Sequence, residues 1–348
     1  MGAVDRRGFL RRVAGVGLAA SAAVRGQAEC INGGAVRWVV PHAVGGGFDR
    51  YSRLIEPYLE QRIGAAIRVD NVPGAGGIRG LNALSESRPD GRTIGIVNVP
   101  AYLIADLTEG FDFDPVEGLT LLASISRLGH VWVTSPEFNL RSLDDFLEAG
   151  RSQGLVFACS SHASLGFLAP AIAGDAMGLK IQFVSGYTGT GEMIMALMRG
   201  EVDALSLSLG VATGRIQAGD LHPLLVTTSE AAEVDPIFEG LPQLFGESGL
   251  TSSLSQSAAE QAESLVQLMR VGRVIAAPPD MGESLFRCMS EAVCETLSDP
   301  ELIRASRERL SPIQAVCAAE TLRNAQAARA AARRLAPIAR NAIARANA

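Results

Sequence analysis

The sequence has no cysteines at zinc-site spacing and no apolar run long enough to span a bilayer. Cys288 and Cys294 lie six residues apart in a helical pattern, about 9 Å along the axis, which is too long for a disulfide. We therefore expect its five cysteines to be buried thiols. No other histidine or cysteine lies at metal spacing from His42, so we predict no metal site.

Positive charge is outweighed by negative charge. The formal net charge is −6, and residues 1–28 hold five arginines against one aspartate, so the remainder is more acidic still. Such a surface gives no electrostatic footprint for nucleic acid, and we predict no nucleic-acid partner. A chain of 348 residues with 47% hydrophobic content can bury a sizeable core, most naturally as two domains.

Residues 1–28 have the pattern of an export signal. Arg6 and Arg7 precede an apolar run from Val13 to Val24, and small residues suited to cleavage follow. The run of about 12 residues is too short for a bilayer core, which needs roughly 20. The pattern resembles a twin-arginine signal and predicts a periplasmic protein, soluble after cleavage.

Short apolar strands alternate with helices in the rest of the chain, which predicts an α/β fold with a largely parallel sheet. Glycine loops follow three of the strands, at residues 45–47, 74–77 and 186–191. Glycines leave backbone N–H groups bare, and a helix that begins there adds unpaired donors and partial positive charge. We predict that the first two loops form an anion cradle built from main chain rather than from arginines.

Two enzyme classes are imitated but not matched. The first glycine loop resembles that of a dinucleotide-binding unit, and so does the acidic Asp70 at the end of the second strand. Residues 45–50, however, do not satisfy G-x-G-x-x-G. Ser160, Ser161 and His162 have the residue types of nucleophilic catalysis, but no G-x-S-x-G elbow surrounds them. We therefore predict a protein that is not an enzyme and uses no cofactor.

Six segments, in order and at the right separations, resemble the solute receptors of tripartite tricarboxylate transporters, the Bug or TctC family. They are residues 40–49, 71–77, 88–93, 186–192, 199–203, and 277–279 with 297–300. The resemblance implies a type II periplasmic binding protein fold, with two α/β lobes joined by crossover strands and a ligand cleft between them. We expect lobe 1 at residues 33–134 plus 232–348, and lobe 2 at residues 135–231.

The resemblance also implies that a small organic carboxylate binds against the first two glycine loops and that lobe 2 closes over it. The implied partners are the large and small membrane subunits of a transporter, and the receptor is expected to be a monomer. A receptor that feeds a membrane sensor is the alternative. The candidate ligand-binding residues are Val44, Gly45, Gly46, Gly47, Phe48, Asp49, Gly74, Ala75, Gly76, Gly77, Ile78, Ser160, Ser161, His162, Ser164, Tyr187, Thr188, Gly189 and Thr190.

Some candidates have a second interpretation. Asp49 lies in the first turn after the glycines, where an acid can cap the helix instead of touching ligand. The Tyr187 ring can stack on a ligand, or it can simply pack on the hinge side of the cleft between the lobes. Phe48 stands where the family commonly has a small hydroxyl residue, and Ile78 where a polar residue is usual. We expect a more apolar pocket wall, which favours aromatic or branched carboxylates over small hydroxylated di- or tricarboxylates.

Overall fold

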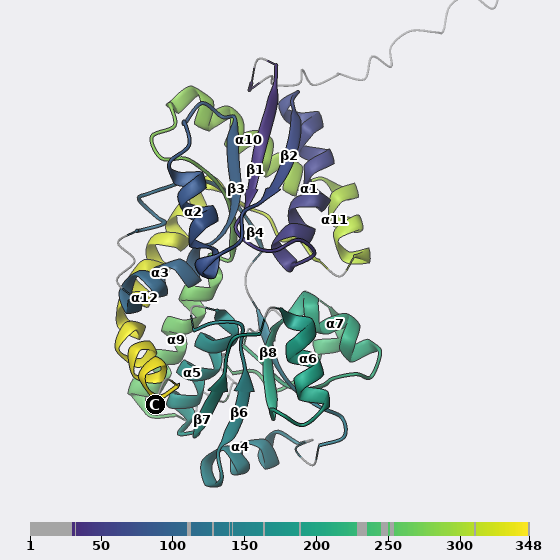
Figure 1. Cartoon of the computed structure of the whole chain (residues 1–348), viewed down its shortest axis with the longest axis vertical. Coiled ribbons are helices and arrows are strands. Elements are labelled where there is room, and N and C mark those ends of the chain that lie inside the picture. The colour runs from purple at the N-terminus through teal and green to yellow at the C-terminus, as the bar shows by residue number, and fades with distance from the viewer. Residues whose placement is uncertain are drawn as a thin grey trace, which may run out of the picture.

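The chain forms two α/β lobes, each built around its own sheet (Figure 1). The computed structural model describes residues 30–31, 33–109, 113–126, 129–138, 140, 142–162, 164–187, 189–227, 235–244, 250, 254–309 and 311–346. The predicted export signal at residues 1–28 lies outside this part of the chain. Within it, no helix is both long and apolar enough to cross a membrane.

The first lobe contains a six-stranded sheet in the order β11-β4-β10-β3-β1-β2. Strands β10 and β11 run against the other four, because β10 is antiparallel to both of its neighbours and β11 is antiparallel to β4. The strands are β1 (Ala35–Val40), β2 (Ala66–Asn71), β3 (Thr93–Asn98), β4 (Thr120–Ser126), β10 (Arg273–Ala277) and β11 (Val316–Cys317).

Helices cover both faces of this sheet. Helices α1, α10 and α11 share one buried apolar cluster with β1, while α2 and α3 belong to a second cluster on the other face. The helical segments are α1 (Gly47–Ile63), η1 (Ala75–Gly77), α2 (Ile78–Ser85), α3 (Val99–Glu109), α10 (Glu283–Leu297) and α11 (Pro300–Glu308). Helix α1 ends at Gly64, whose φ of +70° suits a glycine C-cap.

The second lobe contains a five-stranded sheet in the order β7-β6-β8-β5-β9. Its strands are β5 (His130–Thr134), β6 (Leu155–Ala158), β7 (Ile181–Val184), β8 (Ala204–Ser208) and β9 (His222–Val226). Its helical segments are α4 (Leu143–Ser152), α5 (Leu165–Met177), α6 (Thr190–Met198), α7 (Leu209–Gln217) and η2 (Pro236–Phe238).

The lobe boundaries differ from the expected ones at two places. Strand β5 pairs with β8 and β9, so residues 130–134 belong to the second lobe rather than the first. Residues 235–244 also join the second lobe, because Gln243 bridges to Val226 of β9 and Phe238 is buried in that lobe's core. The backbone pairing of these segments was not visible in their local sequence patterns.

Two long helices lie together at the side of the molecule, and the longer one runs along both lobes (Figure 1). They are α9 (Gln256–Arg270) and α12 (Ala318–Ala346). Helix α12 buries alanines at helical spacing, including Ala328, Ala332 and Ala339, and small side chains let helices approach closely. It packs on α9 and α3, and it also contacts α5 of the second lobe. One buried apolar cluster therefore continues from lobe to lobe.

Four of the five cysteines form disulfides, which corrects the expectation of buried thiols. Cys30 pairs with Cys288 and Cys294 pairs with Cys317, at Cα–Cα distances of 5.5 and 5.3 Å. Cys288 and Cys294 share α10 and do not pair with each other, as their spacing required. Their partners come from distant segments that spacing along one helix cannot reveal. Cys159 is the buried free thiol.

Candidate functional site

The candidate site lies where the two sheets face each other, at the carboxyl ends of their parallel strands. In the first lobe, β3 ends at Asn98, and the start of the antiparallel strand β10 places Arg273 directly opposite Asn98. Phe48 is the second residue of α1, which follows β1 through the first glycine loop. These three residues line one wall of a cavity of about 190 Å³.

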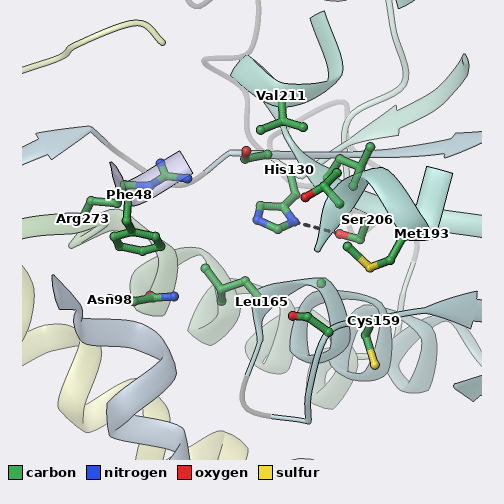
Figure 2. A pocket seen from close by; sticks show the side chains of 14 residues that line it. Phe48, Asn98, His130, Cys159, Leu165, Met193, Ser206, Val211 and Arg273 are labelled. Carbon is green, nitrogen blue, oxygen red and sulfur yellow. Dashed lines mark hydrogen bonds between the residues drawn. The ribbon is translucent and has the colours of Figure 1, made fainter. Parts of the chain in front are cut away.

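The second lobe supplies the opposite wall in the same way. Strand β8 ends at Ser208, and the antiparallel strand β5 begins opposite it with His130. The Nδ1 atom of His130 lies 2.9 Å from the Oγ of Ser206, the contact drawn in Figure 2. The complete lining is Phe48, Asn98, His130, Cys159, Ser160, Leu165, Gly166, Thr190, Met193, Ser206, Leu207, Ser208, Val211 and Arg273.

Arg273 gives the cavity a cation held against aromatic rings. Its guanidinium carbon lies 5.2 Å from the centre of the Phe48 ring and 5.0 Å from that of Tyr51. Both distances are within the range of a cation–π interaction. Burial lowers the pKa of Arg273 from its ordinary value, and the nearby charge of Arg50 lowers it further. An arginine nevertheless stays protonated in proteins, so the cavity contains a permanent positive charge.

Two histidines near Arg273 are neutral at physiological pH. Burial and then the charge of Arg273 lower the pKa of His42 to about 4 and that of His130 to about 3. The His42 ring also packs against Phe48, with 4.3 Å between ring centres. Both imidazoles therefore act as uncharged polar groups, and Arg273 alone supplies positive charge among the described lining residues.

The two predicted glycine loops do lie side by side. The side-chain amide of Asn71 donates to the His42 carbonyl over 3.0 Å, and a Cβ atom added at Gly77 would lie 3.2 Å from the Pro41 carbonyl oxygen. Four of the loop amides are already used inside the loops, because Gly45, Gly46, Gly77 and Ile78 donate to Asp49, Ala43, Gly74 and Ala75.

Of the first-lobe candidates, Phe48 lines the cavity. Asp49 is buried and accepts hydrogen bonds from the Gly45 amide at 2.8 Å and from Arg53 at 3.0 Å, so its carboxylate caps the loop. Val44 is 71% exposed. The remaining first-lobe candidates lie in the loops or at the helix starts that follow them, outside the cavity lining: Gly45, Gly46, Gly47, Gly74, Ala75, Gly76, Gly77 and Ile78.

Of the second-lobe candidates, Ser160 and Thr190 line the cavity. Ser164 occupies the N-cap position of α5, and its hydroxyl donates to the Ser161 carbonyl at 2.7 Å instead of accepting from the helix. The centre of the His162 ring lies 4.9 Å from that of Phe167. Tyr187 packs against the lobe's own core, and Gly189 precedes α6. Thr188 lies outside the described residues.

Sequence reasoning missed Arg273, His130, Asn98, Ser206 and Ser208. The glycine loops follow the strands, whereas Arg273 and His130 are the first residues of their strands. An antiparallel strand starts at the edge where its parallel neighbours end, so its first residue reaches the same site. The available signal was a single charged or imidazole residue at the head of an otherwise apolar strand.

Comparisons with known proteins agree with this architecture. Rpa4515 of R. palustris, solved with adipate, matches with a TM-score of 0.71 at 22% identity, covering 88% of this chain and 97% of that one. MatC from Rhodopseudomonas palustris with bound malate matches with a TM-score of 0.69 at 21% identity, covering 88% of this chain and 98% of that one. The periplasmic binding protein BugD matches with a TM-score of 0.66 at 18% identity, covering 90% of this chain and 97% of that one. The expected periplasmic binding protein fold is confirmed.

Sequence comparisons identify the family. BugT of Bordetella pertussis is 25% identical over 213 residues, which are 60% of this chain and 65% of BugT. A UPF0065 protein of Agrobacterium vitis is 24% identical over 200 residues, 57% of this chain and 58% of that protein. The chain thus spans less than two thirds of these relatives. The model of the tripartite tricarboxylate transporter family receptor matches residues 52–305, well over half of the chain. The resemblance drawn from the six segments is confirmed, and the chain belongs to the tripartite tricarboxylate transporter receptor family.

Proposed function

We propose that this chain is an exported solute-binding receptor that captures a small organic carboxylate between its lobes. It presents that solute to a membrane transporter made of one large and one small subunit. The observation that carries the proposal is the cavity between the lobes of a receptor-family fold. Both lobes contribute hydrogen-bonding side chains to it, and its described lining contains no aspartate or glutamate. The malate and adipate in two structures of the same fold are carboxylates, which supports the same class of ligand here.

The proposed location is the periplasm. The twin-arginine pattern of residues 1–28 supports export, although it lies outside the described residues. The disulfides Cys30–Cys288 and Cys294–Cys317 support it independently, because disulfides persist in oxidising compartments such as the bacterial periplasm.

The proposed binding cycle is closure of the two lobes on the ligand. Phe48 contacts it from the first lobe, and Ser160 and Thr190, which also line the cavity, contact it from the second. The glycine loops, which lie outside the lining, reach the ligand when the lobes close. A ligand that touches both lobes favours the closed form by its differential contacts. Charge-assisted hydrogen bonds contribute about 1.5–3 kcal/mol each. Three or four of them reach roughly 6–8 kcal/mol, close to micromolar affinity.

The apolar part of the lining favours aromatic or branched acids. Phe48, Leu165, Met193 and Val211 supply this surface, and Ile78, the other residue expected to do so, lies outside it. Isothermal titration tests the preference directly. We expect aromatic or branched acids to bind ahead of citrate and malate, and the reverse order contradicts the preference.

A thermal-shift screen of the mature protein tests the function itself. The probes are carboxylic acids, their amides and nicotinamide cofactors. We expect only acids to raise the melting temperature, since a ligand at 100 times its Kd stabilises the folded state by about 2.7 kcal/mol. Stabilisation by a nicotinamide cofactor, with no response to any acid, rules out a carboxylate receptor.

A further inference from the structure

Arg273 lies at a place in the cavity where its positive charge can meet a ligand held between the lobes. It begins β10 at the edge where β1 and β3 end, and it lines the cavity beside Phe48 and Asn98. Figure 2 shows Arg273 and Phe48 together on one side, facing His130 and Ser206 on the other. A guanidinium presents planar N–H donors that match the geometry of a carboxylate.

The aromatic rings around Arg273 fix its position. The rings of Phe48 and Tyr51 lie about equally far from its guanidinium carbon, at 5.2 and 5.0 Å. Tyr51 is itself held by its hydroxyl, which donates to the Pro312 carbonyl at 3.0 Å. A cation–π contact uses the charge of the guanidinium, and its in-plane N–H groups are the donors for hydrogen bonding. This arrangement pre-organises the cation, which lowers the entropy cost of binding.

The formal charge of the described lining residues is plus one. The described lining contains Arg273, the neutral His130, and otherwise serines, threonine, asparagine, cysteine, glycine and apolar side chains. Asp49, which follows Phe48 in α1, is ion-paired with Arg53, and Arg50 is exposed outside the lining. A bound monoanion therefore neutralises the cavity. A dianion leaves one buried charge uncompensated, which is costly.

We propose that Arg273 is the cationic anchor of the bound solute and that the cavity takes aromatic or branched monocarboxylates in preference to dicarboxylates. The carboxylate pairs with the Arg273 guanidinium in the first lobe. The uncharged body of the solute lies against Phe48, Leu165 and Met193, and the serine hydroxyls of the second lobe bind its neutral polar groups. This inference rests on the proposed carboxylate receptor function and assigns its specificity to one side chain.

The test is isothermal titration of the mature protein with two matched ligand series. One series is benzoate, benzamide and terephthalate; the other is 4-methylpentanoate, its amide and adipate. The variants are Arg273→Gln, Arg273→Lys and the control Arg37→Gln, which removes an arginine of the same sheet that is ion-paired with Asp70 outside the cavity. Melting curves establish that each variant is folded.

We expect the wild-type protein to bind at least one monocarboxylate at least 10-fold more tightly than its amide and its matched dicarboxylate. Arg273→Gln should weaken that acid about 10- to 100-fold, as loss of a charge-assisted hydrogen bond predicts. Arg273→Lys should restore part of the affinity, and Arg37→Gln should leave it unchanged.

Three results overturn the inference, and they separate it from the proposed function. Equal binding of an acid by folded Arg273→Gln and wild type rejects the anchor, while the receptor function stands. Tighter wild-type binding of terephthalate or adipate than of the matched monoacid rejects the monoanion preference, and again the receptor function stands. If no carboxylate of a wider screen binds the wild-type protein, both proposals fail.

Discussion

Asp49 shows how one side chain shapes the first glycine loop. Burial works to raise the pKa of Asp49, but hydrogen bonds from the Gly45 amide, Arg53 and Asn71 outweigh it and hold that pKa below its ordinary value. The ionised carboxylate binds Gly45, whose φ is +81°, and so holds the loop against the start of α1. The role of Asp49 in this structure is that of a cap.

Replacing Asp49 with alanine should therefore destabilise the protein by about 1–3 kcal/mol, because the hydrogen bonds of its buried carboxylate to the Gly45 amide and to Arg53 are lost. Urea denaturation measures the change. The control is Glu283→Ala, which removes an ion pair whose carboxylate is 85% exposed and should change the free energy of unfolding by less than about 0.5 kcal/mol. Equal effects of the two substitutions would contradict the capping role.

The buried histidines make stability depend on pH. An unfolded histidine binds a proton near pH 6.5, whereas in the folded chain burial and the charge of Arg273 lower the pKa of His42 to about 4 and of His130 to about 3. Between these values the unfolded chain binds more protons, so stability is greatest above pH 6.5 and falls as the pH falls toward 4.

We expect the melting temperature to decrease from pH 7 to pH 5, above the range in which most carboxylates titrate. His42→Phe keeps a ring against Phe48 and removes one titrating group, so its decrease should be shallower. A melting temperature that stays constant over this range in the wild-type protein would show that these histidines titrate normally.

At the scale of elements, a substitution at Gly46 tests whether the ligand contacts the first glycine loop without disturbing the fold of that loop. It is the N-cap of α1 with a φ of −69°, and an added side chain would meet only the Ala43 carbonyl oxygen, at 3.3 Å. Gly46→Val should therefore fold. If the ligand approaches the loop backbone, the variant should lose binding in isothermal titration. Wild-type affinity in folded Gly46→Val would mean that this loop does not contact the ligand.

Helix α10 is fastened at two points, to residue 30 by Cys288 and to β11 by Cys294. Cys30→Ala with Cys288→Ala should lower the free energy of unfolding by about 2–5 kcal/mol. A reducing agent should destabilise the wild-type protein at least as much. Thiol titration of the unfolded, unreduced chain should give one reactive group, Cys159. Five reactive thiols would contradict both pairings.

Local signals predicted the elements that begin or end with glycine or a helix cap. The apolar residues of 48–63 recur at helical spacing, and this segment forms α1 at Gly47–Ile63. Ser142 has a side chain suited to an N-cap, and it caps α4 by accepting a hydrogen bond from the Asp145 amide. The disulfide between Cys30 and Cys288 spans 258 residues, so no local spacing could reveal it. The place of Arg273 and His130 in the site could not be predicted without the strand order, because antiparallel pairing brings both residues there.

At the scale of the whole molecule, the two lobes share one buried cluster through α9, α12 and α5 (Figure 1). Arg345 near the end of α12 also pairs with Asp175 of α5 at 3.5 Å. These contacts lie along the side of the molecule, whereas the cavity lies between the facing edges of the two sheets. We expect closure to rotate the lobes about this shared side and to narrow the cavity on its ligand.

A crystal structure of the mature protein with its tightest-binding carboxylate tests the central claim most directly. The account predicts electron density for the solute between the lobes, with its carboxylate at Arg273. The body of the solute should lie between Phe48 and the opposite wall, which contains Ser160 and Thr190. Density for the solute on the outer surface of either lobe, with the cavity filled only by water, would contradict it.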